Sequence, residues 1–363
     1  MSEKGYKLWN RSFGWAVFTI ALITFGSTVE PTASFWDAGE YIATSAKLQV
    51  GHPPGAPFFQ MMGAFFALFA NTPENVALMV NYMSVFSSAF SILFLFWTLT
   101  ILLKKLPAFA SLDNLFSRLS FFGSATVGTL AFCFSDSFWF NAVEAEVYAM
   151  ATFILSLLFW LGLRWEQEMN TPRGDRWLLL IAFVIGLSFG VHFMGLLTIP
   201  ALGIIYYFKN NKEVDLKGFV IANLVSVAIL LFIFKLLLPL TLAFFGNAEV
   251  YFVNKIGLPF NSGTIIAGLC FVFFFYYTLK LTRQKKWIDF NTGILCVLFL
   301  LIGFSSWLMI PIRANANTVI NENSPSDARS LLAYYNLEQY PETHLFYGPL
   351  FSDAYAGQDD TEP

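Results

Sequence analysis

Charge is scarce in this sequence. Only 12% of its 363 residues are charged, whereas 56% are hydrophobic and the mean hydropathy is +0.60. Soluble globular domains carry about 25% charged residues. Several uncharged runs are long enough to span a bilayer, so the composition excludes an ordinary soluble enzyme and predicts a polytopic membrane protein.

Motifs of soluble nucleotide-dependent enzymes are also missing. The sequence has no GxxxxGK[ST] phosphate loop, no GxGxxG ahead of a helix, no HExxH and no DxD. The cysteines Cys133, Cys270 and Cys296 all fall in apolar runs and form no CxxC pair. We therefore expect buried small side chains rather than a disulfide framework or a zinc site.

Apolar runs predict about nine membrane spans. The first follows three basic residues and has no A-x-A cleavage site behind it, so we predict an uncleaved signal anchor rather than a signal peptide. The run 58–70 is too short to cross a bilayer, so it predicts an interfacial or re-entrant helix. The prolines within 53–57 are predicted to mark the start of this helix. The predicted spans are 13–29, 78–103, 119–135, 148–163, 177–191, 193–208, 219–240, 264–281 and 292–312.

Lysine and arginine sort to one side of these nine spans. With the N-terminus in the cytoplasm, 16 of the 21 basic residues fall on the cytoplasmic side. Cytoplasmic loops carry an excess of Lys and Arg, so this asymmetry supports both the span count and the orientation. The loops 30–77, 136–147 and 246–263 and the tail after 312 are then predicted to face outward. These outer segments collect acids, which predicts that any chemistry takes place outside.

The first outer loop contains the most distinctive stretch, SFWDAGEYIATSAKLQVGHPPGAP at 34–57. Asp37 and Glu40 are three residues apart and would share one face of a helix. Either they are solvated acids at a helix start, or a carboxylate held against apolar surface at the bilayer interface serves as a general base. His52 is either a structural residue of the proline turn or a ligand and hydrogen-bond donor.

Two further motifs place polar groups at span ends. In WFNAVEAEVYAM at 139–150, Glu144 and Tyr148 share a helix face, and Glu146 points elsewhere. These residues either cap a helix, where the dipole favours acids, or bind an acceptor or sugar hydroxyl. In GLSFGVHFMG at 186–195, His192 is either a turn residue or a donor to a phosphate.

Cations lie near the predicted outer interface. Arg313, in PIRANANTVINEN at 311–323, is either a snorkelling anchor or a bidentate grip on a lipid phosphate. Asn315 and Asn317 beyond it can bind hydroxyls or backbone. Lys235 lies inside the seventh span near Pro239. Charge within a membrane is a functional hypothesis by default, although this lysine can also simply reach the outer interface.

Four strings occur in order and resemble a known family: FWDAGEYIATSAKLQVGHPPGAPFF, NAVEAEVYA, GLSFGVHFMGLL and PIRANANTVINEN. Over residues 8–350 the chain resembles a bacterial multi-span family of formerly unknown function, related to the animal protein O-mannosyltransferase of plexin-type domains. The acidic motif followed by His-Pro-Pro is also similar to the GT-C glycosyltransferases. The resemblance implies an all-α polytopic membrane protein, a GT-C-like bundle of about nine helices over 1–312 with interfacial helices in the first outer loop. The tail 313–363 would be extracytoplasmic and could begin a soluble region.

The resemblance also implies a reaction at the outer face of the inner (cytoplasmic) membrane. A sugar, mannose, would move with inversion from a polyprenyl-phosphate donor to a Ser or Thr hydroxyl of an exported protein. Asp37 would be the base and Glu40 would orient the acceptor. Arg313, with His192 or Lys235, would stabilise the phosphate that leaves. The residues expected to bind sugar or acceptor are His52, Glu144, Glu146, Tyr148, Asn315 and Asn317.

No cofactor is required by the sequence and no metal site is predicted, although the outer acids leave Mg²⁺ or Ca²⁺ open. No nucleic acid partner is expected. Two other classes of function stay open. A transporter or flippase of a lipid-linked sugar would usually show inverted repeats and broken helices, which the sequence does not. A non-catalytic subunit would bind its partner through the tail.

Overall fold

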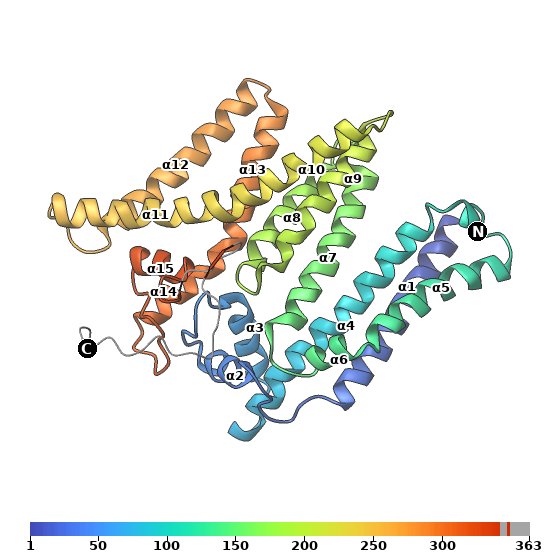
Figure 1. Ribbon diagram of the computed structural model, residues 1–363, viewed down its shortest axis with the longest axis horizontal. Helices are drawn as coiled ribbons and strands as arrows, with labels where there is room; N and C mark the ends of the chain where they lie inside the picture. The colour runs from blue at the N-terminus through green and yellow to red at the C-terminus, as the bar shows by residue number, and fades with distance from the viewer. Residues whose placement is uncertain (342–346, 349–363) are drawn as a thin grey trace.

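The computed structural model describes residues 1–341 and 347–348, and these form helices joined by loops, with no strand among them. One isolated bridge pairs Val50 with Asn321. The helices form a broad, inclined bundle with a wing of long helices at one edge (Figure 1). The predicted all-α class is confirmed for the described chain.

The N-terminal part surrounds an aromatic interior. Its helices α1, α4, α5 and α6 enclose one hydrophobic cluster, in which Phe25, Phe96, Phe121 and Phe122 are fully buried. The helix α7 packs along α4 and connects this part to the rest of the bundle. The bounds are α1 (Glu3–Ser27), α4 (Val76–Leu103), α5 (Leu115–Cys133), α6 (Asp136–Ala142) and α7 (Val147–Glu168).

The second part is built on a close contact between α8 (Asp175–Ser188) and α13 (Ile288–Phe304). A Cβ atom added to Gly186 would lie 2.0 Å from the Leu300 carbonyl oxygen. One added to Gly303 would lie 2.2 Å from the Phe183 carbonyl oxygen. Small residues let membrane helices approach this closely. The helix α9 (Thr198–Asn210) packs beside α7 and α10.

The wing contains one continuous helical stretch of 40 residues, Leu216–Lys255. It runs from α10 (Leu216–Leu231) into α11 (Leu238–Val250) through a π-helical segment over 232–237, and ends in a second π-helical segment over 251–255. Pro239 follows the first π segment, and this local widening accommodates its missing N–H. Helix therefore continues past the predicted span end at 240 and through the first ten residues of the predicted loop 246–263. α12 (Ser262–Gln284) returns beside α11.

Five stretches are long and apolar enough to cross a membrane: 73–103, 147–168, 216–255, 262–284 and 288–314. Helices also form at the other four predicted spans, but α8 and α9 have only 14 and 13 residues. At about 1.5 Å per residue these reach about 20 Å, short of a hydrocarbon core of about 30 Å. The polytopic membrane class is supported, and the predicted count of nine is not reached in the described chain.

Cysteine burial differs from the prediction at one position. Cys133 is buried, Cys296 is half-buried and all three cysteines are free. Cys270 is exposed on α12, so the prediction is wrong there. Its helix belongs to the wing, which has few protein neighbours and can present a small thiol outward.

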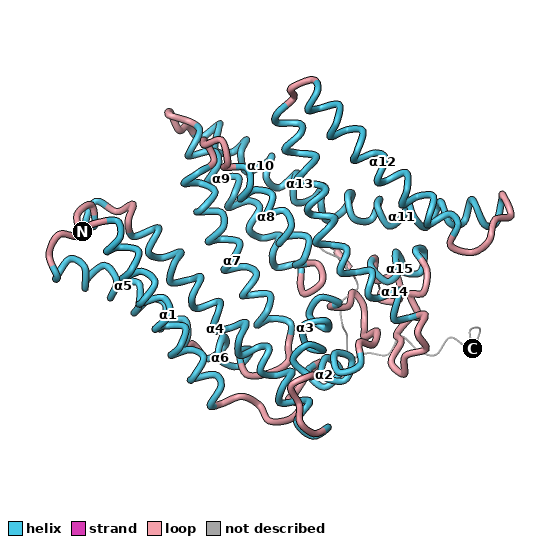
Figure 2. Tube along the Cα trace, turned by 180° about the vertical axis from the view of Figure 1, so that it is seen from behind, coloured by secondary structure: helices cyan, strands magenta, loops and turns pink. Residues whose placement is uncertain are grey.

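The first loop folds into two short helices, α2 (Ala38–Lys47) and α3 (Pro57–Ala67). The prediction of a short helix over 58–70, started by the prolines, is confirmed, because α3 begins at Pro57 and has 11 residues. The helices α14 (Met309–Ala314) and α15 (Ala328–Tyr335) lie at the same end of the bundle as α2 and α3 (Figure 2). The predicted boundary at 312 falls inside α14. Residues 342–346 and 349–363 of the predicted tail domain lie outside the described residues.

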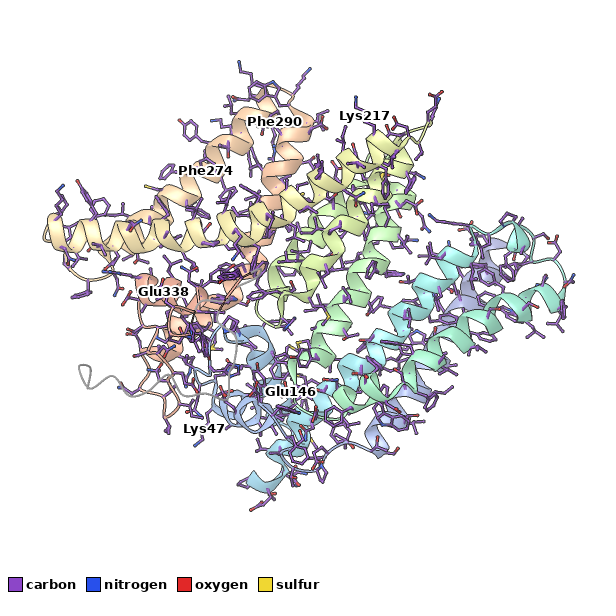
Figure 3. All side chains as sticks on the ribbon, viewed as in Figure 1. Lys47, Glu146, Lys217, Phe274, Phe290 and Glu338 are labelled. Atoms are coloured by element: carbon purple, nitrogen blue, oxygen red, sulfur yellow. The ribbon has the colours of Figure 1, made fainter. Side chains whose placement is uncertain are left out.

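The two ends of the bundle carry different residues. The connections α7–α8, α9–α10 and α12–α13 lie toward one end, and α2, α3, α14 and α15 lie toward the other (Figure 1). Lys217 and Phe290 mark the first end, whereas Lys47 and Glu146 mark the second (Figure 3). The motifs predicted to face outward therefore share one end of the molecule.

Candidate active site

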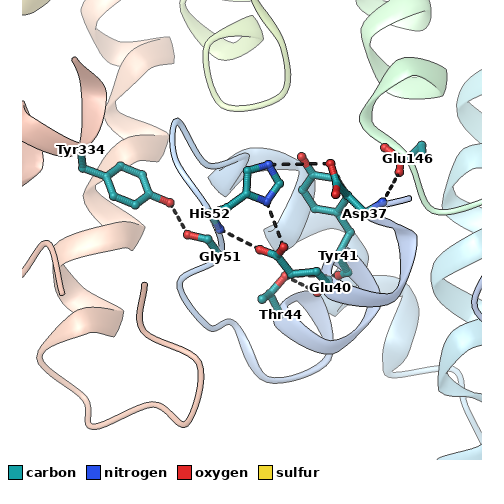
Figure 4. A network of polar contacts seen from close by, with 8 residues as sticks. All are labelled: Asp37, Glu40, Tyr41, Thr44, Gly51, His52, Glu146 and Tyr334. Carbon is teal, nitrogen blue, oxygen red and sulfur yellow. Dashed lines mark hydrogen bonds and ion pairs between the residues drawn. The ribbon is translucent and has the colours of Figure 1, made fainter. Parts of the chain in front are cut away.

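Asp37 and Glu40 meet at His52. Asp37 directly precedes α2 and Glu40 lies in its first turn, and the chain turns at Leu48 to bring His52 back. His52 Nδ1 lies 2.9 Å from Glu40 Oε2, and the His52 backbone N–H donates to Glu40 Oε1 at 2.7 Å. His52 Nε2 is 3.9 Å from Asp37 Oδ2. Figure 4 shows the imidazole between the two carboxylates.

The three side chains differ in exposure and charge. Asp37 is 58% exposed, while Glu40 and His52 are 26% and 27% exposed. Burial would raise the pKa of Glu40, but hydrogen bonds and charge from His52 outweigh burial and lower it. The hydrogen bond with Glu40 raises the pKa of His52, against the effect of burial. Both shifts favour a Glu40 carboxylate paired with a His52 imidazolium, and they leave Asp37 as the exposed acid.

Glu144 and Glu146 tie a distant segment to this cluster. Glu146, at the start of α7, accepts the backbone N–H of Asp37 at 3.0 Å, and Glu144 accepts the Ser34 hydroxyl at 2.6 Å. The two acids are 3% (Glu144) and 5% (Glu146) exposed. Burial, reinforced by the charge of Asp37, raises the pKa of Glu146 to about 7. Both acids thus bind the first loop from inside.

The segment after the last span holds the loop that carries His52. The Tyr334 hydroxyl, on α15, donates to the Gly51 carbonyl oxygen at 2.6 Å. Val50 exchanges two 3.1 Å backbone hydrogen bonds with Ile320 and Glu322. Tyr334 is only 2% exposed, so this contact is closed to solvent. The described part of the tail is therefore packed on the candidate site.

Arg313 is engaged with the end of α2. Its guanidinium donates to the carbonyl oxygens of Leu48 and, at 3.0 Å, Lys47. These carbonyls lack partners inside the helix, and the helix dipole favours a cation there. Asn315 is also engaged, since it donates to the Pro311 and Ser326 carbonyls at 2.8 and 2.6 Å. Asn317 is exposed and has a positive φ of 51°. Donor or acceptor binding by these three residues stays a prediction.

His192 lies in a turn that packs against α3. The backbone N–H groups of Phe58 and Phe59 donate to the Gly190 carbonyl at 2.8 and 3.0 Å. The His192 ring faces Tyr148, with 5.5 Å between ring centroids, and its Nδ1 accepts the Met194 N–H. Burial lowers the pKa of His192, which favours a neutral ring whose Nε2 carries the proton.

Lys235 sits in the first π segment of the wing and is exposed. Its amine lies 4.9 Å from the centre of the Phe234 ring. The Phe234 carbonyl accepts the Tyr335 hydroxyl at 3.2 Å, which connects this segment to α15. Among the described contacts, none joins Lys235 to the Asp37 cluster, and its role at a phosphate stays a prediction.

One group of side chains in the described chain has the donor set for a divalent cation. Asp37, Glu40 and His52 each offer one ligand atom, and these atoms lie within 4.8 Å of one another. Oxygen and imidazole donors suit several divalent metals. However, Nδ1 of His52 is already paired with Glu40. If His52 is protonated, its own positive charge takes the place of a metal cation between the two carboxylates.

Several residues of the site carry no signal that sequence spacing could reveal. Ser34, Gly51 and Tyr334 act through contacts between distant segments. Tyr41 could have been predicted from spacing, because it follows Asp37 by four residues and therefore shares its helix face. Its ring lies 5.8 Å from His52, and burial raises its pKa.

Residues 37–215 match the family described as the protein O-mannosyl-transferase TMEM260 N-terminal domain. The predicted resemblance to a protein O-mannosyltransferase family is confirmed over these residues, and the similarity to GT-C enzymes stays a prediction. The TMEM260-like segment begins at Asp37 and includes Glu40, His52, Glu144 and Glu146, whereas Lys235 and Arg313 lie beyond it.

Two curated relatives carry the same name. The chain is 25% identical over 162 residues to protein O-mannosyl-transferase tmem260 of Dictyostelium discoideum, which is 44% of this chain and 18% of the relative. It is 29% identical over 177 residues to protein O-mannosyl-transferase TMEM260 of Mus musculus, which is 48% of this chain and 22% of the relative. The match therefore spans about a fifth of each TMEM260 relative. No solved structure matches the chain.

Proposed function

We propose that this chain is the membrane part of a GT-C-type glycosyltransferase. It moves a sugar, mannose by the names of its relatives, from a polyprenyl-phosphate donor to Ser or Thr hydroxyls of exported proteins. The reaction takes place at the end of the bundle that carries α2. In this proposal that end faces away from the cytoplasm, on the outer side of the inner membrane. The observation that carries the proposal is the exposed Asp37 carboxylate backed by the His52–Glu40 pair.

Asp37 is the general base in this proposal. One Asp37 oxygen takes the proton of the acceptor hydroxyl while the hydroxyl oxygen attacks the anomeric carbon. The bond from that carbon to the lipid phosphate breaks, the configuration inverts and the phosphate leaves with the electron pair. The 58% exposure of Asp37 leaves room for an acceptor, which the buried Glu146 does not offer.

The other members of the cluster position the base. Glu40 makes two bonds to His52, so it supports the imidazolium rather than the acceptor in this proposal. His52 Nε2 faces Asp37. A protonated His52 places positive charge beside the site where negative charge moves from Asp37 to the leaving phosphate during the reaction. Glu146 fixes the Asp37 backbone from the protein side.

A transporter or flippase of a lipid-linked sugar is the competing class. Transporters usually place their substrate site near the bilayer midplane, between broken helices. The acids and His52 instead lie on α2 and on loops at one end of the bundle, which favours surface chemistry over passage (Figures 1 and 3).

Transfer by the expressed protein in membranes tests the proposal. The full chain is incubated in membranes with polyprenyl-phosphate-mannose and a Thr-rich exported acceptor, and mass spectrometry records added hexose. We expect Asp37→Asn to lower the rate by about 10²–10⁴-fold, the usual loss when a general base is removed. Asp136→Asn is the matched control, because Asp136 lies in the first turn of α6 outside the cluster.

Equal transfer by wild type and Asp37→Asn at equal folded yield would remove Asp37 from the base role. Movement of the lipid-linked sugar across vesicle membranes without transfer would favour the transporter class instead.

A further inference from the structure

We propose that the cleft between the C-terminal end of α12 and the N-terminal ends of α8 and α13 binds the headgroup of an anionic phospholipid. The cleft has a volume of about 460 Å³ and is lined by Arg283, Lys286, Asn291 and Thr292, among others. Sites for small ligands span about 300–1,000 Å³. The cleft lies at the end of the bundle opposite the Asp37 cluster, where Phe290 is seen in Figure 3.

The charge of the cleft is positive and unsatisfied by protein. Arg283 and Lys286 are exposed, and neither forms a salt bridge within the described chain. Arg164 and Arg176, in contrast, both pair with Glu168. A phosphodiester would supply the partner that the cleft lacks, since Arg and Lys both recognise phosphate oxygens.

One acid also lines the cleft. Asp175 lies in the first turn of α8, where the helix dipole favours a negative charge, and its Oδ2 accepts the Thr292 hydroxyl at 2.9 Å. Two cations therefore line the cleft together with one acid, which already accepts the Thr292 hydroxyl. Across residues 280–289 four basic residues stand against the single acid Asp289.

The surroundings argue for a lipid rather than a soluble anion. Trp287, Ile288 and Phe290 are 50%, 72% and 72% exposed directly beside the cations. Tryptophan next to basic residues is typical of the interfacial region, and basic pockets between helices on the cytoplasmic side bind anionic headgroups.

The backbone offers a clean variant. Lys286 has a φ of 58°, in a turn where the Trp287 N–H donates to the Thr282 carbonyl at 2.9 Å. Glycine is favoured in this left-handed region because it has no Cβ. Lys286→Gly therefore removes the cation and relieves the backbone at the same time, so a loss of binding in this variant is not caused by a loss of fold.

Native mass spectrometry of the full chain tests the proposal, with phosphatidylglycerol and phosphatidylcholine as probes. We expect wild type to prefer phosphatidylglycerol. We expect Arg283→Ala/Lys286→Gly to bind it about thirtyfold more weakly, because each cation near an anionic lipid contributes about 1 kcal/mol. Lys209→Ala/Lys212→Ala, at the same end but outside the cleft, is the control and should bind as wild type does.

Three results would overturn the proposal. They are equal affinity of both double variants, equal binding of the two lipids by wild type, and displacement of phosphatidylglycerol by millimolar inorganic phosphate. The last would assign the cleft to a soluble anion. No sugar transfer is measured, so this outcome does not depend on the proposed activity.

Discussion

The backbone N–H of Asp37 donates a 3.0 Å hydrogen bond to the carboxylate of Glu146, 109 residues further along the chain. Asp37 ends the loop before α2, and Glu146 ends the loop before α7. One contact therefore fixes two helix starts against each other. It also places a buried acid directly behind the exposed acid that we propose as the base.

Glu146→Gln should change how activity depends on pH. Burial raises the pKa of Glu146 from 4.5 to about 7. Above that pH the ionised carboxylate accepts the Asp37 N–H more strongly than the neutral acid does. We expect wild-type transfer to rise through about pH 7 and the glutamine variant to lose this inflection. Glu144→Gln should keep the inflection but move it slightly to lower pH, because the charge of Glu144 is one of the smaller causes of the raised Glu146 pKa.

Glu146 affects stability in the opposite direction: its contribution to stability falls as pH rises, whereas activity is expected to rise. The folded protein binds the Glu146 proton more tightly than the unfolded chain, so this group stabilises the fold at low pH. Its contribution disappears as pH rises from about 4.5 to 7. Glu146→Gln should flatten that part of the stability profile in thermal melts. A glutamine profile that falls as steeply as the wild-type profile would contradict the buried-acid description.

Glu40→Gln should lower the pKa of His52. The hydrogen bond with Glu40 is the main cause of the raised value, and glutamine supplies no negative charge. A raised histidine pKa stabilises the fold below the ordinary value of 6.5, and this contribution is lost as pH rises through the folded value. The chain has three histidines, so the His52 ring protons can be followed by NMR, with His52→Gln, whose spectrum lacks them, to assign them. An unchanged His52 titration would show that Glu40 is not its partner.

Gly51→Ala should reduce activity while the protein stays folded. An added Cβ would lie 2.5 Å from Glu40 Oε1, the atom that accepts the His52 N–H. The carboxylate can move away, but only by giving up that bond. Misplacement of about 1 Å in a catalytic group costs about a hundredfold in rate. In Gly39→Ala the nearest neighbour of the new Cβ is Ala33 at 3.8 Å, so this control should retain the wild-type rate.

Removal of divalent metal should leave transfer unchanged. His52 lies between Asp37 and Glu40 and is 2.9 Å from the latter, and its raised pKa favours an imidazolium, whose positive charge would take the place of a cation. We expect equal rates before and after treatment with EDTA. A rate that EDTA abolishes and Mg²⁺, Mn²⁺ or Ca²⁺ restores would instead make these three side chains metal ligands.

Local spacing predicted the centre of the site but not its supports. Asp37 and Glu40 lie three residues apart, and the prolines after His52 indicate a turn. Helix periodicity and turn chemistry are therefore enough to predict that these residues belong to the site. Glu146 and Tyr334 reach the same loop from distant positions, and nothing in their neighbourhoods specifies those contacts. For this reason the sequence leaves Glu146 either as a helix cap or as a ligand-binding residue, and it gives no sign of Tyr334.

The same limit applies to the spans. Hydropathy marked every apolar run, but it could not show that the chain from 216 to 255 continues as one helix. Pro239 is normally a sign of a break, and the π segment before it absorbs that break. Arg313 was predicted at the membrane interface as an anchor or a phosphate ligand. Its partners at the end of α2 are backbone carbonyls, which sequence patterns do not reveal.

Gly186→Ala should destabilise the bundle more than any alanine substitution at an open glycine. The new methyl group would lie 2.0 Å from the Leu300 carbonyl oxygen, and backbone cannot move aside as a flexible side chain can. α8 and α13 would have to separate, and overpacking of this kind costs about 1–3 kcal/mol or more. Gly123→Ala is the control, because no atom lies within 4 Å of its added Cβ. Thermal melts in one detergent should show a lower midpoint for Gly186→Ala and an unchanged or higher one for Gly123→Ala. Equal midpoints would mean that the two helices do not pack through their glycines.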